Sequence, residues 1–250
     1  MRGLNRQQRI RRGAATFAIV AFVSLAIMRM SDKATIAEPE FPPLASDTLQ
    51  QGPGWTIRTE EFDGNVAAGV IFSSYSRESL LSYADAARSN TEATFSQHET
   101  VPALVTFRRP VPIDEFAGLI EPSGATVISY QIRTIEPDGR RGTLGGAPEP
   151  NGVVLDLDHV ADFAARQESK GASPLRILGV IDAEVVVDRQ SYDALSKLDA
   201  VFLVDLTRAT VVDSLSMDLR EKIAISDVRL EPLYWHLEDT GLVSSSVEGP

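Results

Sequence analysis

The fold is decided by residues 177–206, which read ILGVIDAEVVVDRQSYDALSKLDAVFLVDL. Residues 177–187 are rich in β-branched side chains and predict a strand. Apolar residues at helical spacing predict a short helix over 191–198. Four consecutive apolar residues within 201–206 predict a second strand, central in its sheet and buried on both faces. This segment therefore forms a strand-helix-strand unit.

A similar unit precedes it. Residues 103–107 (ALVTF) predict a strand, a short helix follows that ends at Pro122-Ser123-Gly124, and residues 126–135 predict the next strand. Short helices that link strands in this way require crossover packing. We therefore expect an α+β fold in which a sheet carries helices on one side. In finer detail, we expect two ferredoxin-like strand-helix-strand units.

The remaining segments have simpler patterns. Periodicity and turn residues predict strands at 55–58 and 66–72 around the turn Asp63-Gly64, one long helix over 76–97 capped by Ser76, a loop over 137–152 and a helix over 158–170.

The first 30 residues carry a membrane-targeting pattern. Five arginines precede residue 13, and residues 13–30 are almost wholly apolar, near the lower length limit for a spanning helix. The excess of arginine before this segment predicts a cytoplasmic N-terminus and an extracytoplasmic remainder at the cell membrane. The expected organisation is a basic tail (1–12), a transmembrane signal-anchor (13–30), a flexible linker (31–54), an α+β domain (55–240) and a disordered tail (241–250).

A short apolar segment after basic residues also describes a cleavable signal peptide. Thr35-Ile36-Ala37 has suitable small residues, but Arg29, Asp32 and Lys33 separate it from the apolar segment. A retained anchor is the favoured prediction, and a cleaved, secreted domain is the alternative. A twin-arginine signal at Arg11-Arg12 is weaker still, because the following residues do not match that motif.

Composition excludes several classes of function. The chain has no cysteine, which rules out disulfides, thiolate metal sites and a cysteine nucleophile. The whole chain carries a net charge of −11, but residues 1–33 hold 7 of the 24 basic and 1 of the 35 acidic residues, so the remainder carries −17. Such an acidic domain repels nucleic acid. We therefore expect a protein partner, basic or neutral, and no nucleic acid.

The densest polar cluster lies near the start of the predicted helix 158–170. Asp158, His159 and Asp162 would hold a hard cation if further ligands joined them. The favoured interpretation is that these acids cap the helix and interact with its dipole. We expect no cofactor and no metal.

The glycine-rich segment 139–146 contains Arg140 and Arg141. Its spacing matches neither nucleotide-binding motif, and Pro148 and Pro150 prevent the helix that such a motif needs. A flexible loop is the favoured interpretation, and an anion or partner contact through the two arginines is the alternative.

No catalytic motif is present. No serine lies in Gly-x-Ser-x-Gly, and no histidine has an acidic partner at a recognisable spacing. We therefore expect a binding or regulatory module without catalytic activity, and an exported hydrolase or metal-dependent enzyme is the alternative.

The segment 231–238 contains two adjacent large aromatics, Tyr234 and Trp235. Aromatic side chains of this size either dock onto their own domain and complete its core or anchor a partner at an interface centre. Tyr234 and Trp235 are thus the candidate partner-binding residues.

The strand-helix-strand spacing between residues 103 and 206 resembles that of two families of small exported modules. These are the extracytoplasmic domains of membrane-anchored sigma-factor regulators and the propeptide-type inhibitors of subtilisin-like proteases. The resemblance rests on the ALVTF strand and the short helices, and no motif residue carries over. It implies a regulatory or interaction role rather than catalysis.

Overall fold

The structure is a computed structural model that describes residues 46–62, 65–136, 138–148, 162, 165–166, 175–215, 224–225, 228, 230 and 232–244. The chain divides into two units, Met1–Pro42 and Pro43–Pro250, and every described residue belongs to the second. The predicted anchor at 13–30 therefore lies outside the described residues. Within the described part, no helix has the length and apolar character that a membrane crossing requires.

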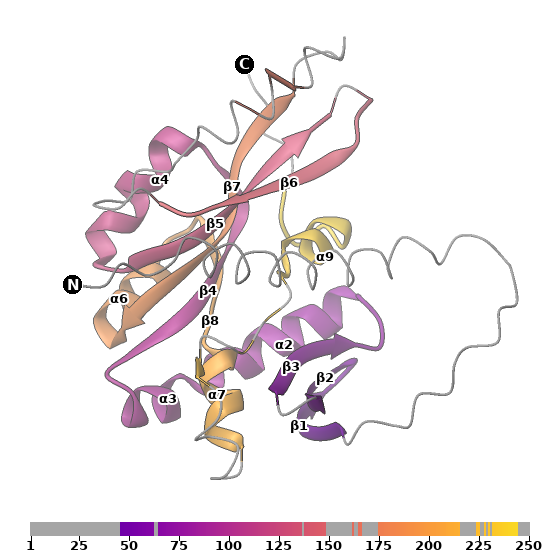
Figure 1. Ribbon diagram of the computed structural model, residues 1–250, viewed down its shortest axis with the longest axis vertical. Coiled ribbons are helices and arrows are strands. Elements are labelled where there is room, and N and C mark those ends of the chain that lie inside the picture. The colour runs from indigo at the N-terminus through magenta and orange to yellow at the C-terminus, as the bar shows by residue number, and fades with distance from the viewer. Residues whose placement is uncertain are drawn as a thin grey trace, which may run out of the picture. The chain divides into compact units, whose positions relative to one another are not determined.

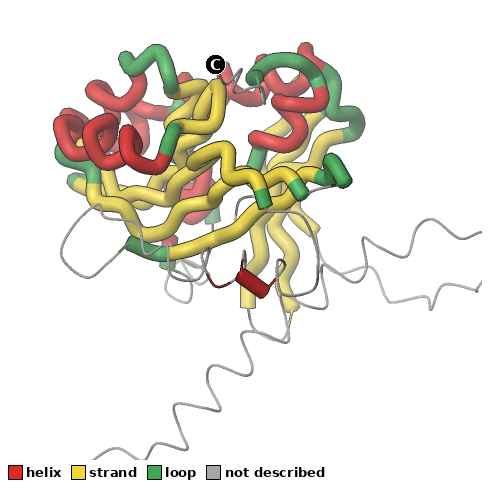
Figure 2. The backbone as a smooth tube through the Cα atoms, turned by 90° about the horizontal axis from the view of Figure 1, so that it is seen from above, coloured by secondary structure: helices red, strands yellow, loops and turns green. Residues whose placement is uncertain are grey.

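The described residues form an α+β fold with two antiparallel sheets (Figures 1 and 2). The small sheet has the order β1-β2-β3, and the large sheet has the order β6-β5-β7-β4-β8. The strands are β1 Ser46–Gly52, β2 Trp55–Phe62, β3 Asn65–Phe72, β4 Thr100–Val111, β5 Thr126–Ile135, β6 Arg141–Gly146, β7 Arg176–Asp188 and β8 Val201–Asp205. The helices are α2 Arg77–Ser89, α3 Thr91–Gln97, α4 Ile113–Ile120, the 3-10 turn η1 Glu121–Ser123, α6 Arg189–Ser196, α7 Thr207–Ser214 and α9 Tyr234–Asp239.

The two predicted units interleave in the large sheet. One unit is β4-α4-β5 and the other is β7-α6-β8. β7 lies between β5 and β4, while β4 lies between β7 and β8, so the strands of each unit are separated by a strand of the other. In register, Val105 of β4 pairs with Ala183 of β7 and with Val204 of β8.

The predicted long helix over 76–97 is two helices. Its start is confirmed, since the Ser79 N–H donates to the Ser76 hydroxyl at 3.1 Å. It breaks at Asn90, between α2 and α3. The Thr91 hydroxyl donates to the Arg88 carbonyl at 2.8 Å, a side-chain bond that competes with the helical backbone pattern.

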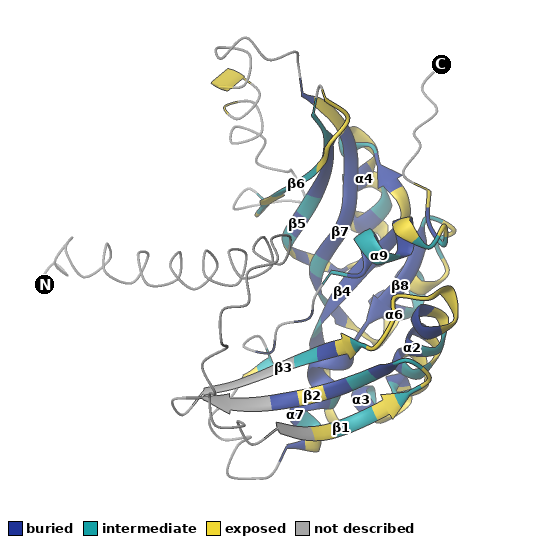
Figure 3. Cartoon of the chain, turned by 90° about the vertical axis from the view of Figure 1, so that its right-hand side faces the viewer, coloured by how far each residue is buried: buried dark blue, intermediate teal, exposed yellow. Residues whose placement is uncertain are grey.

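Helices cover both faces of the large sheet, so the prediction of helices on one side is wrong. On one face, Phe116 of α4 and Leu195 of α6 pack in a cluster with Val105 of β4. On the other, Tyr83 of α2 and Leu237 of α9 share a cluster with residues of the small sheet and of β4 and β8. Figure 3 shows the large sheet largely buried, whereas β1 carries exposed residues.

β8 is buried on both faces as predicted, but it is an edge strand rather than a central one. Among the described strands it pairs only with β4, yet all five of its residues are buried. Val201 and Val204 join the cluster under α4 and α6, while Phe202 and Leu203 join the opposite cluster. A continuous apolar run indicates that both faces of a strand are buried. It does not indicate a central position, because helices can also cover both faces of an edge strand.

Three segments expected to be unstructured contain ordered residues. The predicted linker 31–54 includes β1, and the predicted loop 137–152 includes β6. The predicted tail 241–250 contains Val243, which is buried, and Ser244, whose N–H donates to the Arg108 carbonyl at 2.9 Å. Main-chain pairing with a neighbouring segment orders all three, and a composition rich in polar residues and glycine does not reveal such pairing.

We predict that Gly179→Ala strongly destabilises the domain. Gly179 lies in β7 at φ +135°, and an added Cβ would lie 2.3 Å from the Val111 carbonyl oxygen. We expect a loss of about 2 kcal/mol or more in the free energy of unfolding, measured by urea denaturation. The control is Gly69→Ala in β3, where an added Cβ meets nothing within 4 Å. Equal losses in both variants would contradict the steric argument.

Candidate functional site

Tyr234, one of the two candidate partner-binding residues, lies in the core. It begins α9 and is 0% exposed, with its hydroxyl donating to the Ser244 carbonyl at 3.1 Å. Burial, followed by the nearby Glu238 carboxylate, raises the pKa of its phenol. Leu237, three residues later, is buried beside it in the same cluster. In this position Tyr234 docks α9 onto the domain and presents no surface to a partner.

Trp235, the second candidate, is half-buried and contacts a buried cation. The Arg133 guanidinium carbon lies 3.7 Å from the centroid of its ring, a cation–π contact. Arg133 comes from β5, is 0% exposed and forms an ion pair with Glu238, which lies one helical turn after Trp235. Burial lowers the pKa of Arg133, although Glu238 opposes this shift. Trp235 and Glu238 lie one helical turn apart on α9, and both contact Arg133.

The structure separates the two arginines of the glycine-rich segment. The Arg141 Nη1 lies 3.2 Å from the Glu238 Oε2, and the Arg141 side chain is 44% exposed. Arg140 instead pairs with Glu136 at 2.9 Å and with Asp138 at 2.6 Å. Two guanidinium groups thus share the buried Glu238 carboxylate, and Arg141 is the one that reaches solvent.

A second aromatic contact involves His236, the residue that follows Trp235 in α9. The rings of Tyr75 and His236 are stacked with centroids 3.4 Å apart and an interplanar angle of 8°. Tyr75, between β3 and α2, is 43% exposed, and His236 is half-buried. We call Tyr75, Trp235, His236 and Arg141 the α9 surface. Tyrosine, tryptophan and arginine are the residue types enriched at the energetic centres of protein interfaces.

Of the residues described here, sequence reasoning named Trp235 as a candidate and gave Arg141 as an alternative contact, but it did not single out Tyr75, His236 or Arg133. Arg133 had a local signal, because it interrupts the β-branched pattern of residues 126–135. Tyr75 had none, since its partner His236 is far away in the sequence and only the fold brings the two rings together.

A second polar group lies within the large sheet. Asp182 of β7 faces Thr106 of β4 and Gln131 of β5 in register. It is 2% exposed, and burial raises its pKa to about 8. Within the described part of the chain, its Oδ2 and the Thr106 hydroxyl have no hydrogen-bond partner. Sequence reasoning did not single out Asp182; the alternation of Asp182 and Glu184 in an apolar strand is the signal that could have found polar groups on one sheet face.

Glu184, two residues further along β7, is satisfied by its neighbours. It forms an ion pair with Arg208 of α7 and accepts a hydrogen bond from the Ser129 hydroxyl at 3.2 Å. Asp182 is therefore a buried acid beside a paired one. Because burial raises its pKa to about 8, Asp182 remains protonated near neutral pH.

The candidate metal ligands are not brought together in the described structure. Asp162 is an exposed helical residue, whereas Asp158 and His159 lie outside the described residues. Among the described residues, no group of three or more His, Cys, Asp or Glu side chains could hold a metal ion.

One histidine does have an acidic partner. The His98 Nε2 lies 2.9 Å and 3.0 Å from the two carboxylate oxygens of Asp213, which is 115 residues away. A hydrolase would also need a nucleophile bonded to this histidine. The hydrogen bonds found for the described residues include none between His98 and a serine or threonine hydroxyl.

Comparison of the chain with protein-family models, with curated proteins and with solved structures finds no match. The functional argument therefore rests on the geometry above.

We predict that Asp182 makes stability fall as pH rises. Its folded pKa of about 8 exceeds the unfolded value, so its contribution is fully present below about pH 4 and is lost as pH rises through 8. Asp182→Asn should remove this pH dependence, which changes the free energy of unfolding by at most about 5 kcal/mol. The measurement is the free energy of unfolding from pH 4 to 9. Asp85→Asn, at a 77% exposed carboxylate, controls for the loss of one charge. Parallel curves for wild type and Asp182→Asn would contradict the assignment.

Proposed function

We propose that this protein is a single-pass membrane protein of the cell membrane whose acidic extracytoplasmic domain is a non-catalytic binding or regulatory module for a protein partner. The N-terminal sequence supports the anchor, with five arginines before an apolar segment at 13–30. The charge of −17 on the residues after 33 supports a protein partner rather than nucleic acid.

The α9 surface is the observation that carries the binding role. An exposed tyrosine stacked on His236, a half-buried Trp235 and a partly exposed Arg141 lie around one short helix. Arg141 is held by Glu238 and Trp235 contacts Arg133, so part of the surface is preorganised by buried contacts. Preorganised aromatic and arginine groups reduce the entropy cost of binding.

We further propose that the large sheet is ferredoxin-like. Its strands β5-β7-β4-β8 are all antiparallel to their neighbours, and two crossover helices, α4 and α6, pack against the same apolar cluster. This is the arrangement of two split β-α-β units. β6 then adds one strand at the β5 edge.

The proposed topology predicts which residues face the outside of the cell. The chain has no cysteine, so single cysteines can be introduced without interference. In intact cells, a membrane-impermeant maleimide should label Ser96→Cys, at an exposed residue of α3, and should not label Asn5→Cys until the membrane is permeabilised. Fractionation should leave both variants in the membrane. Labelling of Asn5→Cys in intact cells would reverse the orientation, and release of Ser96→Cys into the soluble fraction would favour the cleaved domain.

The partner role predicts a loss of binding when the α9 surface is changed. The full chain, solubilised in detergent, is used for capture and quantitative mass spectrometry, with Tyr75→Ala plus Arg141→Ala as the test variant. Both side chains are more than 40% exposed, so the fold should survive, as thermal unfolding would verify. We expect at least about tenfold less of a partner that wild type retains.

The matched control is Ile128→Ala on β5, which removes a side chain that is 41% exposed and lies outside the α9 surface. It should retain the partner at the wild-type level. Equal retention by wild type, control and test variant would refute the α9 surface as the binding site.

A further inference from the structure

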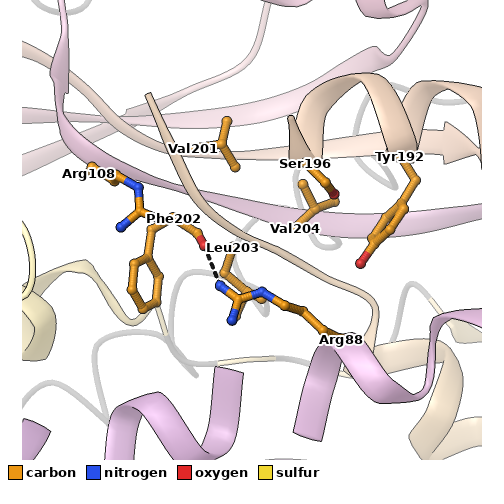
Figure 4. Close-up of a pocket in the computed structure, with 8 residues that line it drawn as sticks. All are labelled: Arg88, Arg108, Tyr192, Ser196, Val201, Phe202, Leu203 and Val204. Atoms are coloured by element: carbon orange, nitrogen blue, oxygen red, sulfur yellow. Dashed lines mark hydrogen bonds between the residues drawn. The ribbon is translucent and has the colours of Figure 1, made fainter. Parts of the chain in front are cut away.

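A recess beside the edge strand β8 has a cationic wall (Figure 4). Its volume is about 390 Å³, within the range of small-ligand sites. It is lined by Arg88 of α2, Arg108 of β4, Tyr192 and Ser196 of α6, and Val201, Phe202, Leu203 and Val204 of β8. None of these residues belongs to the α9 surface, so the recess is a separate feature.

Two arginines converge on one aromatic ring in the recess. The guanidinium carbons of Arg88 and Arg108 lie 5.9 Å and 5.3 Å from the centroid of the Phe202 ring. Arg88 is also fixed by a hydrogen bond, since its Nη2 donates to the Phe202 carbonyl at 2.8 Å. Figure 4 shows both side chains reaching Phe202 from different elements. Both positive charges therefore lie within 5.9 Å of the centre of the same ring.

These charges are poorly neutralised. The Arg88 Nη1 pairs with Asp85 at 2.9 Å, but that carboxylate is 77% exposed and water screens the pair. Arg108 is exposed and has no carboxylate partner among the described residues. In a domain whose overall charge is strongly negative, two arginines on one aromatic ring without a buried counterion favour a site for an anion.

The geometry favours a side chain over an added strand as the ligand. The β8 residues that line the recess are at most 4% exposed. The Phe202 carbonyl at the strand edge already accepts a hydrogen bond from Arg88. Strand addition would require both the carbonyl and the edge to be free. The hydroxyl groups of Tyr192 and Thr91 are hydrogen-bonded at 2.9 Å, which positions Tyr192 in the α6 wall of the recess.

We propose that this recess binds the carboxylate of an acidic side chain carried by a protein segment, with Arg108 and Arg88 as its guanidinium ligands and Phe202 as the ring that holds them. A planar guanidinium matches the two oxygens of a carboxylate. The site does not depend on the α9 surface, and either can fail without the other.

The test uses the full chain in detergent micelles with ¹⁵N-labelled arginine, observed through the arginine Nε–Hε signals. The probe is the peptide acetyl-Gly-Gly-Glu-Gly-Gly-amide, and the same peptide with glutamine is the uncharged comparison. We expect saturable shifts of the Arg88 and Arg108 signals with the glutamate peptide only. Arg108→Gln should weaken binding by about tenfold.

The matched control is Arg109→Gln, which removes the neighbouring exposed charge outside the recess and should leave the affinity within about twofold of wild type. Equal shifts with both peptides, or equal losses in the two variants, would overturn the proposal. Inorganic phosphate at matched ionic strength is the third arm. Tighter saturable binding of phosphate than of the glutamate peptide would replace the carboxylate assignment.

Discussion

The structure depends on one constraint, which is that the adjacent strands β4 and β8 of the large sheet are apolar on both faces. β4 sends Val105 into the cluster beneath α4 and α6 and Leu104 into the opposite cluster, and β8 does the same with Val204 and Leu203. A sheet with two apolar faces needs a packed layer on each. The crossover helices α4 and α6 supply one layer, and α2, α9 and the small sheet contribute to the other. The N-terminal hairpin strands are therefore part of the core rather than an appendage.

The second face of the sheet is not uniform. Toward β4 and β8 it is apolar, whereas on β5 and β7 it carries Arg133, Asp182 and Glu184. α9 spans this division. Its Tyr234 and Leu237 enter the apolar cluster, and its Glu238 pairs with Arg133. A buried ion pair contributes little net stability but is costly to break, so this one is better understood as fixing where the short helix docks.

Both proposed contact sites contain arginine side chains held by a cation–π contact. Arg133 is held against Trp235, and Arg88 and Arg108 are held against Phe202. An aromatic face positions a guanidinium without neutralising its charge. At Arg133 the ring and Glu238 together fix a buried, ion-paired cation, whereas Arg88 and the exposed Arg108 keep positive charge beside the recess of an acidic domain.

The sequence by itself determined the elements of the two interleaved units. β5 was predicted at its observed bounds, and β7, β8, α4 and α6 lie close to theirs, because the spacing of apolar side chains along a strand or helix is a local property. For the candidate site, the same local reasoning named Tyr234 and Trp235, and it gave a contact through Arg140 and Arg141 only as the alternative to a flexible loop. Only the tertiary structure decided that β1 and β6 are strands, that β8 lies at an edge, and that Tyr234 is buried while Tyr75 stacks on His236. These features depend on partners distant in the chain, and no local pattern of residues encodes the identity of a distant partner.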